Sequence, residues 1–255
     1  MLIDRLGHIC KKISPDRIIS LVPSWSEFIF DLGAEERLVG RTKYCVEPKS
    51  IQSIPTVGGT KNPDIGQIAE LEPDLVIINK EENKVQDINS MRALGFNLLI
   101  TGAITIPEAL EEMALIEFVI THRTNRTRQI ASIIAEHSQE NSSSYSFIYL
   151  VWLDPLMVAS HSTYISRLIS LAGGQNLIGN QWNDRYPQLD IDTLISLNPN
   201  YLFLPDEPYK FNQKHIEYFT DMGYTGTIVT LDGKLASWYG TRLKDAISYF
   251  HQVGK

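Results

Sequence analysis

The 255-residue sequence is poor in cysteine, with only Cys10 and Cys45, and it has no low-complexity tract. It also lacks any apolar run of the roughly 18 residues that a membrane span requires. The two thiols can pair or stay free, and spacing alone does not decide between these states. A net charge of -7 argues against a polyanionic partner, because phosphate binding needs clustered Lys and Arg. The remaining composition is that of an ordinary globular protein, long enough for one large domain or two small lobes.

Motifs of common enzymes are also missing. The sequence contains no GxGxxG, GxxxxGK[ST], GxSxG or HExxH. Glu81 and Glu82 have no nucleophile or base beside them, so we expect a protein that is not an enzyme and has no catalytic residue. The histidines lack the paired spacing of a metal site, so we expect no metal held directly by side chains; they are His8, His122, His137, His161, His215 and His251.

The N-terminal segment, MLIDRLGHICKKISPDR, has neither an apolar centre nor a small-residue cleavage site. It is therefore not expected to act as a secretory signal. On this ground alone the expected compartment is the cytoplasm, unless a leader precedes the segment.

Short β-branched runs alternate with helical patterns, which is typical of βαβ units around parallel sheets. An extension over 1–15 precedes an N-terminal α/β lobe over 16–104, with strands at 17–22, 37–43, 74–79 and 97–102 and helices at 64–71 and 84–94. Ser24 and Glu27 are spaced as a capping box for a helix that Gly33 ends. A C-terminal α/β lobe over 141–255 has strands at 146–152, 201–205 and 227–232 and helices at 161–172, 190–196, 212–221 and 240–252.

One long helical pattern lies between the two series. Apolar residues keep helical spacing over 106–138, and Thr105 with Glu108 forms a second capping box. A helix of this length spans about 45 Å. We therefore predict one continuous backbone helix over 105–140 that joins the lobes as a strut.

A weak internal repeat favours two similar lobes. IAELEPDLVIINKEE (68–82) resembles LISLNPNYLFLPDEP (194–208), so that Leu71 corresponds to Leu197 and Glu81 to Glu207. Two such halves facing one another bring the carboxyl ends of both sets of strands to one crevice, where open α/β sheets bind ligands. The alternative is chance, because helix–proline–strand units are common.

All four tryptophans, Trp25, Trp152, Trp182 and Trp238, fall at strand ends or in loops. Tyr44, Tyr186, Tyr209, Phe211 and Tyr239 lie in the same kind of segment. Any single ring can simply cap the core, but together they favour a cleft for a wide, partly apolar ligand.

Polar groups accompany these rings in the loops. VGGTKNPD offers the backbone of Gly59 with Thr60 and Lys61, and KEEN follows a strand with Glu81. Lys61, Arg185 and Arg242 can hold ligand carboxylates or phosphates, although each can equally be a solvated surface charge.

Five segments together resemble the substrate-binding proteins of cobalamin and ferric-siderophore ABC transporters, the helical-backbone metal receptor family. They are RIISLVPSWSEFIFDLGAEERLVGRT, VGGTKNP, LEPDLVIINKEEN, HSTYISRLISLAGGQNLI and RYPQLDIDTLISLNPNYLFLPDEPYKF. The resemblance covers about residues 16–250. It implies a class III periplasmic-binding-protein-like fold, with two mainly parallel α/β lobes joined by one long helix, and a ligand between the lobes whose metal is already chelated, as in cobalamin or a ferric siderophore.

The resemblance also implies the ligand contacts. The residues of the N-terminal wall are Trp25, Tyr44, Gly59, Thr60 and Lys61. Those of the other wall are Trp152, Tyr186, Glu207, Tyr209 and Trp238. The loop residues Glu81, Arg185, Tyr239 and Arg242 complete the predicted ligand contacts.

Family members dock on their permease through one surface glutamate on each lobe, and the corresponding positions here are Gly66 and Asp192. The resemblance thus implies ABC import by a monomeric, periplasmic or membrane-surface protein. The two departures, with the missing signal, leave open a cytoplasmic carrier or sensor of a metal chelate. A third alternative is an enzyme acting on the bound chelate through Glu81, Glu82 or Glu207.

Overall fold

The structure is a computed structural model that describes residue 7, residues 14–139 and residues 145–253. The chain divides into two compact units. Unit 1 contains the described residues up to Ala103 together with Pro107–Ala131 and Tyr239–Thr241, and unit 2 contains Ile104–Ile106, the described residues of Ser132–Trp238 and those from Arg242 onward. Cys10 lies outside the described residues, whereas Cys45 is a buried free thiol.

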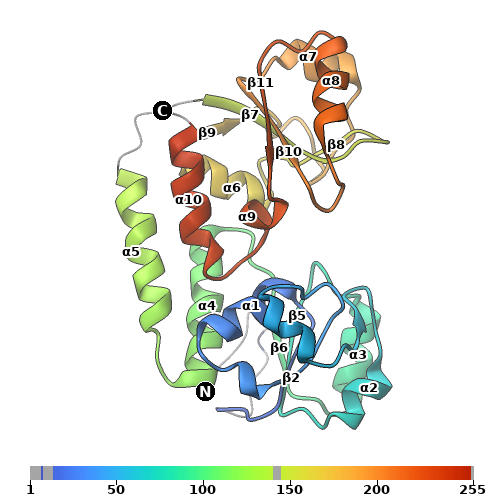
Figure 1. Ribbon diagram of the computed structural model, residues 1–255, viewed down its shortest axis with the longest axis vertical. Coiled ribbons are helices and arrows are strands. Elements are labelled where there is room, and N and C mark those ends of the chain that lie inside the picture. Colours follow the sequence, from blue (N-terminus) through green and yellow to red (C-terminus); the bar gives the residue numbers. More distant parts are fainter. Residues whose placement is uncertain (1–6, 8–13, 140–144, 254–255) are drawn as a thin grey trace. The chain divides into compact units, whose positions relative to one another are not determined.

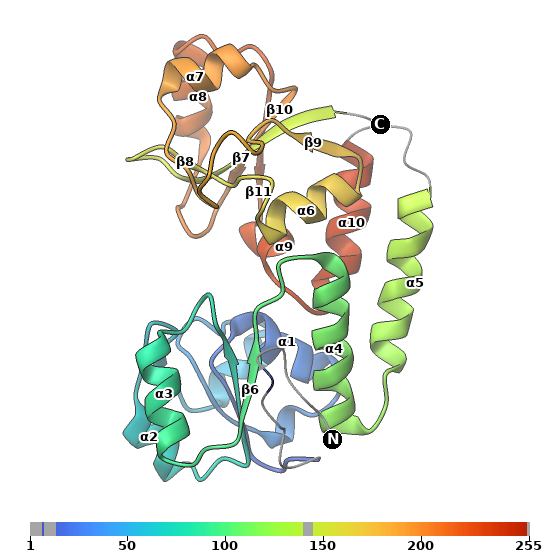
Figure 2. The same cartoon turned by 180° about the vertical axis from the view of Figure 1, so that it is seen from behind.

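Unit 1 is built on a four-stranded parallel sheet in the order β2-β1-β5-β6 (Figure 1). Its elements are β1 (Ile18–Ser20), α1 (Pro23–Asp31), η1 (Glu35–Arg37), β2 (Leu38–Arg41), η2 (Lys49–Ser53), β3 (Gly58–Gly59), β4 (Asn62–Pro63), α2 (Ile65–Glu70), β5 (Leu75–Asn79), α3 (Val85–Ala93), β6 (Leu98–Thr101) and α4 (Ile106–Thr121). Side chains alternate between the two faces of each strand, so Ile19, Val76 and Ile100 pack with Ile68 of α2 and Met91 of α3. Figures 1 and 2 show α1 and α4 on the other face of the sheet.

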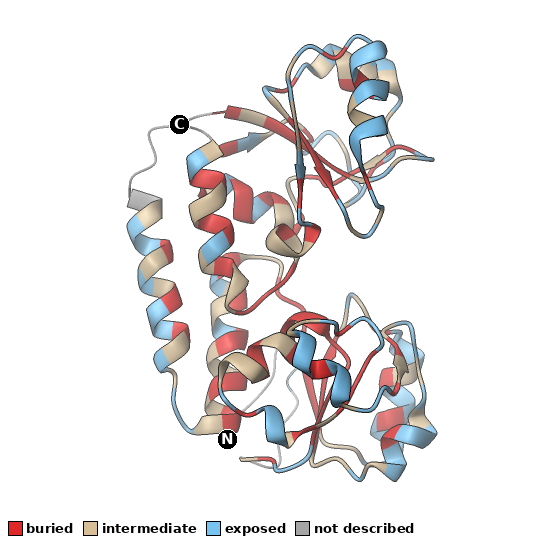
Figure 3. Cartoon of the chain, viewed as in Figure 1, coloured by how far each residue is buried: buried red, intermediate tan, exposed pale blue. Residues whose placement is uncertain are grey.

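Unit 2 contains a five-stranded sheet in the order β11-β10-β7-β8, with β9 paired to β7. Its elements are β7 (Tyr145–Trp152), β8 (Met157–Val158), α6 (Tyr164–Leu171), β9 (Gly174–Asn176), α7 (Ile191–Leu197), β10 (Tyr201–Pro205), α8 (Gln213–Asp221), β11 (Thr227–Leu231), α9 (Gly233–Ser237) and α10 (Arg242–Val253). The strands are parallel except for β8, which forms a hairpin with β7. Leu150, Leu202 and Leu204 pack with Leu194 of α7 and Phe219 of α8. Figure 3 shows that the buried residues concentrate in the strands and on the inner faces of the helices.

The predicted strut of one continuous helix over 105–140 is wrong. The structure has two helices, α4 and α5 (Asn125–Gln139), separated at His122, whose φ of 58° is left-handed. The buried Glu117 carboxylate of α4 accepts hydrogen bonds from the backbone N–H groups of Arg126 (2.9 Å) and Thr127 (2.8 Å). These N–H groups belong to the first turn of α5, where the helix itself provides no acceptor for them. A side chain of α4 therefore fixes the start of α5.

The capping box predicted at Ser24 is also wrong, although the helix and its end at Gly33 are present. Helix α1 already begins at Pro23 with Val22 as N-cap, so Ser24 lies inside its first turn. Proline at this first position needs no N–H partner, and the helix starts two residues earlier than Ser24 as N-cap would predict. Gly33 ends the helix with φ of 67°, as predicted.

The internal repeat recurs in the local structure of the two units. Asp64 caps α2 through Gln67 N–H, and Asp190 caps α7 through Thr193 N–H. The chain then turns through a left-handed residue in each unit, Glu72 with φ of 42° and Asn198 with φ of 41°. Two residues later, the side chains of Asp74 and Asn200 accept hydrogen bonds from the backbone at β1 and β7, respectively. Such a match at every step is more than a shared helix–proline–strand pattern requires.

Candidate functional site

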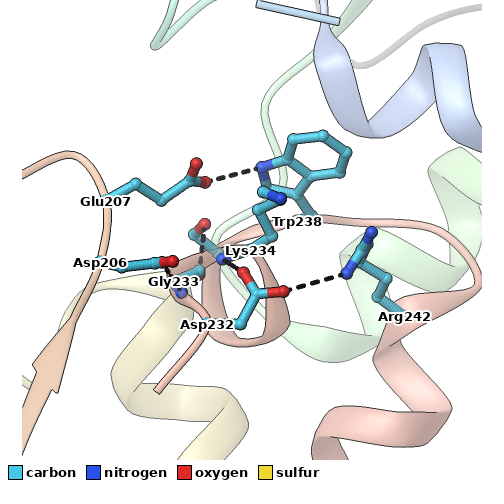
Figure 4. A network of polar contacts seen from close by, with 8 residues as sticks. Asp206, Glu207, Asp232, Gly233, Lys234, Trp238 and Arg242 are labelled. Atoms are coloured by element: carbon cyan, nitrogen blue, oxygen red, sulfur yellow. Dashed lines mark hydrogen bonds and ion pairs between the residues drawn. The ribbon is translucent and has the colours of Figure 1, made fainter. Parts of the chain in front are cut away.

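A network of charged residues lies at the carboxyl ends of β10 and β11 in unit 2 (Figure 4). Asp206 accepts a hydrogen bond from Gly233 N–H at 2.9 Å, and Asp232 caps α9 by accepting from Lys234 N–H at 2.9 Å. The Arg242 guanidinium lies 3.5 Å from the Asp232 carboxylate. The turn after each strand therefore presents carboxylates at the sheet edge where ligands of α/β proteins bind.

Trp238 occupies the centre of this network. Its indole N–H donates to the Glu207 carboxylate at 3.1 Å (Figure 4). The Arg242 guanidinium carbon lies 5.1 Å from the ring centroid and the Lys234 ammonium 5.9 Å, both within the range of cation–π attraction. Only 8% of Trp238 is exposed, so the ring is a largely buried part of the site.

Glu207 is held in place by a close backbone approach. A Cβ on Gly233 would lie 2.6 Å from both the Cγ and the carbonyl oxygen of Glu207, so only glycine permits this contact. Burial raises the pKa of the Glu207 carboxyl, and the Lys234 ammonium and the Trp238 hydrogen bond lower it in part. The Glu207 side chain is half-buried, so its charge interacts more strongly with neighbouring charges and dipoles than the charge of a solvated carboxylate does.

An exposed aromatic group lies at the end of β7. Trp152 is 40% exposed, and its ring makes a T-shaped contact with Tyr209 at 5.1 Å between centroids. Tyr209 in turn packs at 4.7 Å on the buried Phe211. Trp152 and Tyr209 thus form a ring pair that is packed on the core through Phe211 and accessible at Trp152.

The half-buried Arg185 and the exposed Tyr186 form a second pair in unit 2. The guanidinium lies 5.9 Å from the Tyr186 ring centroid, and Tyr186 is 39% exposed. The Arg185 carbonyl accepts a hydrogen bond from Ser160 N–H at 2.9 Å, which ties this loop to the segment after β8.

The structure also brings together the predicted residues of unit 1, apart from Trp25. The Lys61 ammonium donates to the Glu81 carbonyl at 2.8 Å, and the Thr60 carbonyl accepts from Asn83 at 2.7 Å. Gly59 lies beside the ring of Tyr44, which is 51% exposed. Tyr44 follows β2 and Glu81 follows β5, so these two lie past the carboxyl ends of strands, and the β3–β4 hairpin brings Gly59 and Lys61 to them.

Two of the predicted ligand contacts are interior residues of unit 1. Trp25 has no exposed surface, and its ring stacks on Tyr239 at 5.2 Å with an interplanar angle of 14°. The Trp25 indole donates to the Thr101 hydroxyl at 3.0 Å, and the Tyr239 hydroxyl donates to the Ala103 carbonyl at 3.0 Å. With both polar atoms paired inside the unit, Trp25 and Tyr239 support the fold. That they also contact a ligand stays a prediction.

Sequence reasoning missed three charged members of the network, Asp206, Asp232 and Lys234. The signal for two of them is the sequence LDGK, where an aspartate before a short helix is typical of an N-cap. Among the described residues, no three His, Cys, Asp or Glu side chains are placed to hold a metal ion together. Within the same residues, no helix is both long and apolar enough to cross a membrane.

A hollow of about 540 Å³ lies away from this network, at the amino ends of β7, β10 and β11. Its tyrosines, Tyr145 and Tyr201, donate their hydroxyls to backbone carbonyls at 3.1 Å and 2.9 Å, and the Asn200 side chain accepts from Ser146. These groups already hold the fold together, and the hollow is shallow. The carboxyl-edge network is therefore the better candidate site despite the size of the hollow.

Comparison with known proteins supports the fold and its class. Residues 18–100 match the family described as periplasmic binding protein. The vitamin B12-binding protein of Vibrio cholerae serotype O1 is 24% identical over 203 residues, which cover 76% of this chain and 72% of that protein. That of Pectobacterium carotovorum is 21% identical over 236 residues, covering 90% and 84%.

Solved structures give the same picture at the level of the fold. The periplasmic vitamin B12 binding protein of Vibrio cholerae superposes with a TM-score of 0.78 at 20% identity, covering 93% of this chain and 96% of that one. The apo periplasmic heme-binding protein from Roseiflexus sp. RS-1 gives 0.79 at 21% identity, covering 94% and 99%. The predicted family resemblance and the predicted α/β fold of two parallel-sheet parts are confirmed.

Proposed function

We propose that this chain, a relative of the periplasmic binding proteins, is a substrate-binding protein that captures a bulky metal chelate for import. The observation that carries the proposal is the carboxyl edge of unit 2, where the exposed ring of Trp152 and the half-buried ring of Tyr209 accompany the Glu207–Trp238 network. Large rings offer apolar contact area with few torsions to freeze, and the polar groups beside them fix the orientation of a ligand.

Within this class we propose a cobalamin-like corrinoid as the ligand, ahead of heme or a ferric siderophore. The curated relatives named above bind vitamin B12. A cobalt ion already held by its corrin needs no cluster of protein ligands, which agrees with the donor sets of the described residues. The predicted contacts in unit 1, Tyr44, Gly59, Thr60, Lys61 and Glu81, are part of the proposal. A periplasmic or membrane-surface location follows from the same relationship.

An ABC permease is the proposed partner. Gly66 and Asp192, the positions that correspond to the docking glutamates, are both exposed. Each is the second residue of a helix, α2 and α7, after an aspartate N-cap, so the two occupy equivalent places in the repeat. Because one docking glutamate is absent and the other is shortened to aspartate, we expect weak or altered permease contacts.

The test is a competition measured by native mass spectrometry. The purified protein is mixed with equal amounts of cyanocobalamin, hemin and a ferric hydroxamate siderophore, and the bound species is identified by mass. The proposal predicts a 1:1 complex with cyanocobalamin. Exclusive binding of hemin or the siderophore would keep the chelate-binding class and reject the corrinoid. Absence of all three complexes, with the protein folded, would reject the proposed function.

A further inference from the structure

Tyr149 is a buried residue of unit 2 whose hydroxyl group is unpaired. It lies on β7 with 1% of its surface exposed, and its hydroxyl has no hydrogen-bond partner in the described part of the chain. Tyr145, four residues earlier on the same face of β7, donates its hydroxyl to the Phe250 carbonyl at 3.1 Å. A buried unpaired hydroxyl destabilises a fold, so its presence needs an explanation.

The position of Tyr149 points to the carboxyl-edge network. Tyr149 pairs in register with Phe203 of β10, and β10 ends two residues later, immediately before Asp206 and Glu207. Phe203 packs on Phe250 of α10 at 5.3 Å, so Tyr149 is on the face of the sheet that α10 covers. Helices α9 and α10 contact each other, and Glu207 lies against Gly233 at the start of α9. Tyr149 and Glu207 therefore lie toward the same end of the same face.

The electrostatics agree with this placement. Burial raises the pKa of the Tyr149 phenol well above its usual value, and the largest charge contribution comes from the Glu207 carboxylate, followed by Asp206. One carboxylate oxygen of Glu207 accepts the hydrogen bond from Trp238. A carboxylate can accept several hydrogen bonds, so Glu207 can accept another.

We infer that Tyr149 is a positioning residue of the proposed ligand site, whose hydroxyl donates to the Glu207 carboxylate once a ligand has displaced that carboxylate from Trp238. The inference rests on the proposed function. In this structure, the Glu207 carboxylate accepts the indole N–H, and the phenol has no partner among the residues that the structure describes. In the bound state, the carboxylate turns toward the phenol, and the indole N–H is released for an acceptor on the ligand.

The exchange lowers the free-energy cost of opening the Glu207–Trp238 contact. A charged carboxylate that loses one donor in a partly buried site is strongly destabilised unless another donor replaces it. An O–H···O⁻ hydrogen bond from Tyr149 is of the strong, charge-assisted kind. Ligand binding then pairs a hydroxyl that the ligand-free fold leaves unpaired.

The experiment compares Tyr149→Phe with the matched control Tyr145→Phe, using cyanocobalamin as the probe. Tyr149→Phe is expected to bind about tenfold more weakly, the scale of one hydrogen bond, while the Tm of the ligand-free protein is unchanged or higher. Tyr145→Phe is expected to do the opposite, lowering the Tm without changing the affinity. In a Glu207→Ala background, Tyr149→Phe should weaken binding no further, because the two side chains act as one unit.

The remaining outcomes distinguish a failure of this inference from a failure of the proposed function. If the wild type binds and Tyr149→Phe binds equally well, the inference is overturned and the proposed function stands. A lower Tm for ligand-free Tyr149→Phe would show that the hydroxyl is already paired, and losses that add in the double variant would show that it does not act through Glu207. If the folded wild type binds none of cyanocobalamin, hemin and the ferric hydroxamate siderophore, the proposed function fails and the inference falls with it.

Discussion

At the scale of single residues, the predicted aromatic contacts differ in burial. Trp152 ends β7 and Trp25 lies in α1 after β1, yet one is 40% exposed and the other fully buried. The difference arises because Trp25 finds two partners distant in sequence, Thr101 and Tyr239. Partners so distant in sequence do not affect the residue pattern around Trp25. The sequence therefore places Trp25 after a strand but does not predict its environment.

Replacement of Trp25 by alanine tests the interior assignment. We expect Trp25→Ala to lower the free energy of unfolding by about 3–5 kcal/mol, the usual cost of emptying a core site of an aromatic ring. Tyr44→Ala, at an exposed position of the same unit, should change it by less than about 0.5 kcal/mol. Urea denaturation followed by circular dichroism measures both. Trp25→Ala with normal stability and no ligand binding would mean that Trp25 contacts the ligand.

Glu207 should make stability depend on pH. Its pKa is raised by burial in the folded protein, so the folded state resists ionisation more than the unfolded chain does. The resulting destabilisation is absent below the unfolded pKa and grows as pH rises through the folded pKa. Glu207→Gln keeps an acceptor for Trp238 but cannot ionise. Its Tm should match that of the wild type near about pH 4 and exceed it near about pH 8. A constant difference across this range would contradict the pKa shift.

At the scale of elements, the sequence predicts the longer strands and most of the helices, but not the short elements β3, β4, β8, β9 and α9. The expected strands at 74–79 and 201–205 are β5 and β10, and Gly33 ends α1 as expected. These predictions depend only on the spacing of apolar residues and on the position of glycine. Both are local features of the sequence, so they are sufficient to place these elements. The break between α4 and α5 depends on the buried Glu117 carboxylate reaching the next helix. In sequence Glu117 is one more polar position in a long helical pattern, so the turn could not be foreseen.

The α4–α5 turn gives a prediction of its own. Glu117→Ala removes the acceptor of two backbone N–H groups and of the Thr127 hydroxyl, which donates at 2.7 Å. We expect unfolding free energy to fall by about 3 kcal/mol, the scale of hydrogen bonds to a buried charge. Glu136→Ala, at an exposed position of α5, is the control and should cost little. Hydrogen exchange at Arg126 and Thr127 should accelerate in Glu117→Ala; unchanged protection there would contradict the capping role.

At the scale of the whole molecule, two units built on one repeat each carry polar loops at the carboxyl ends of their strands. The N-cap aspartates, left-handed turns and strand-anchoring side chains of the repeat coincide at corresponding positions. Unit 1 offers loops fastened by Lys61 and Asn83, and unit 2 offers rings and carboxylates. The prediction of a ligand held between the two units stays a prediction.

The proposed function requires that accessible aromatic rings at the carboxyl edge of unit 2 contact the ligand. The most direct measurement is the affinity of Trp152→Ala for cyanocobalamin, read from its absorbance change and paired with the Tm of the free protein. Because Trp152 is 40% exposed, we expect binding weakened by about 1–3 kcal/mol and an almost unchanged Tm. A wild type that binds cyanocobalamin and a stable Trp152→Ala variant that binds it equally well would contradict the account.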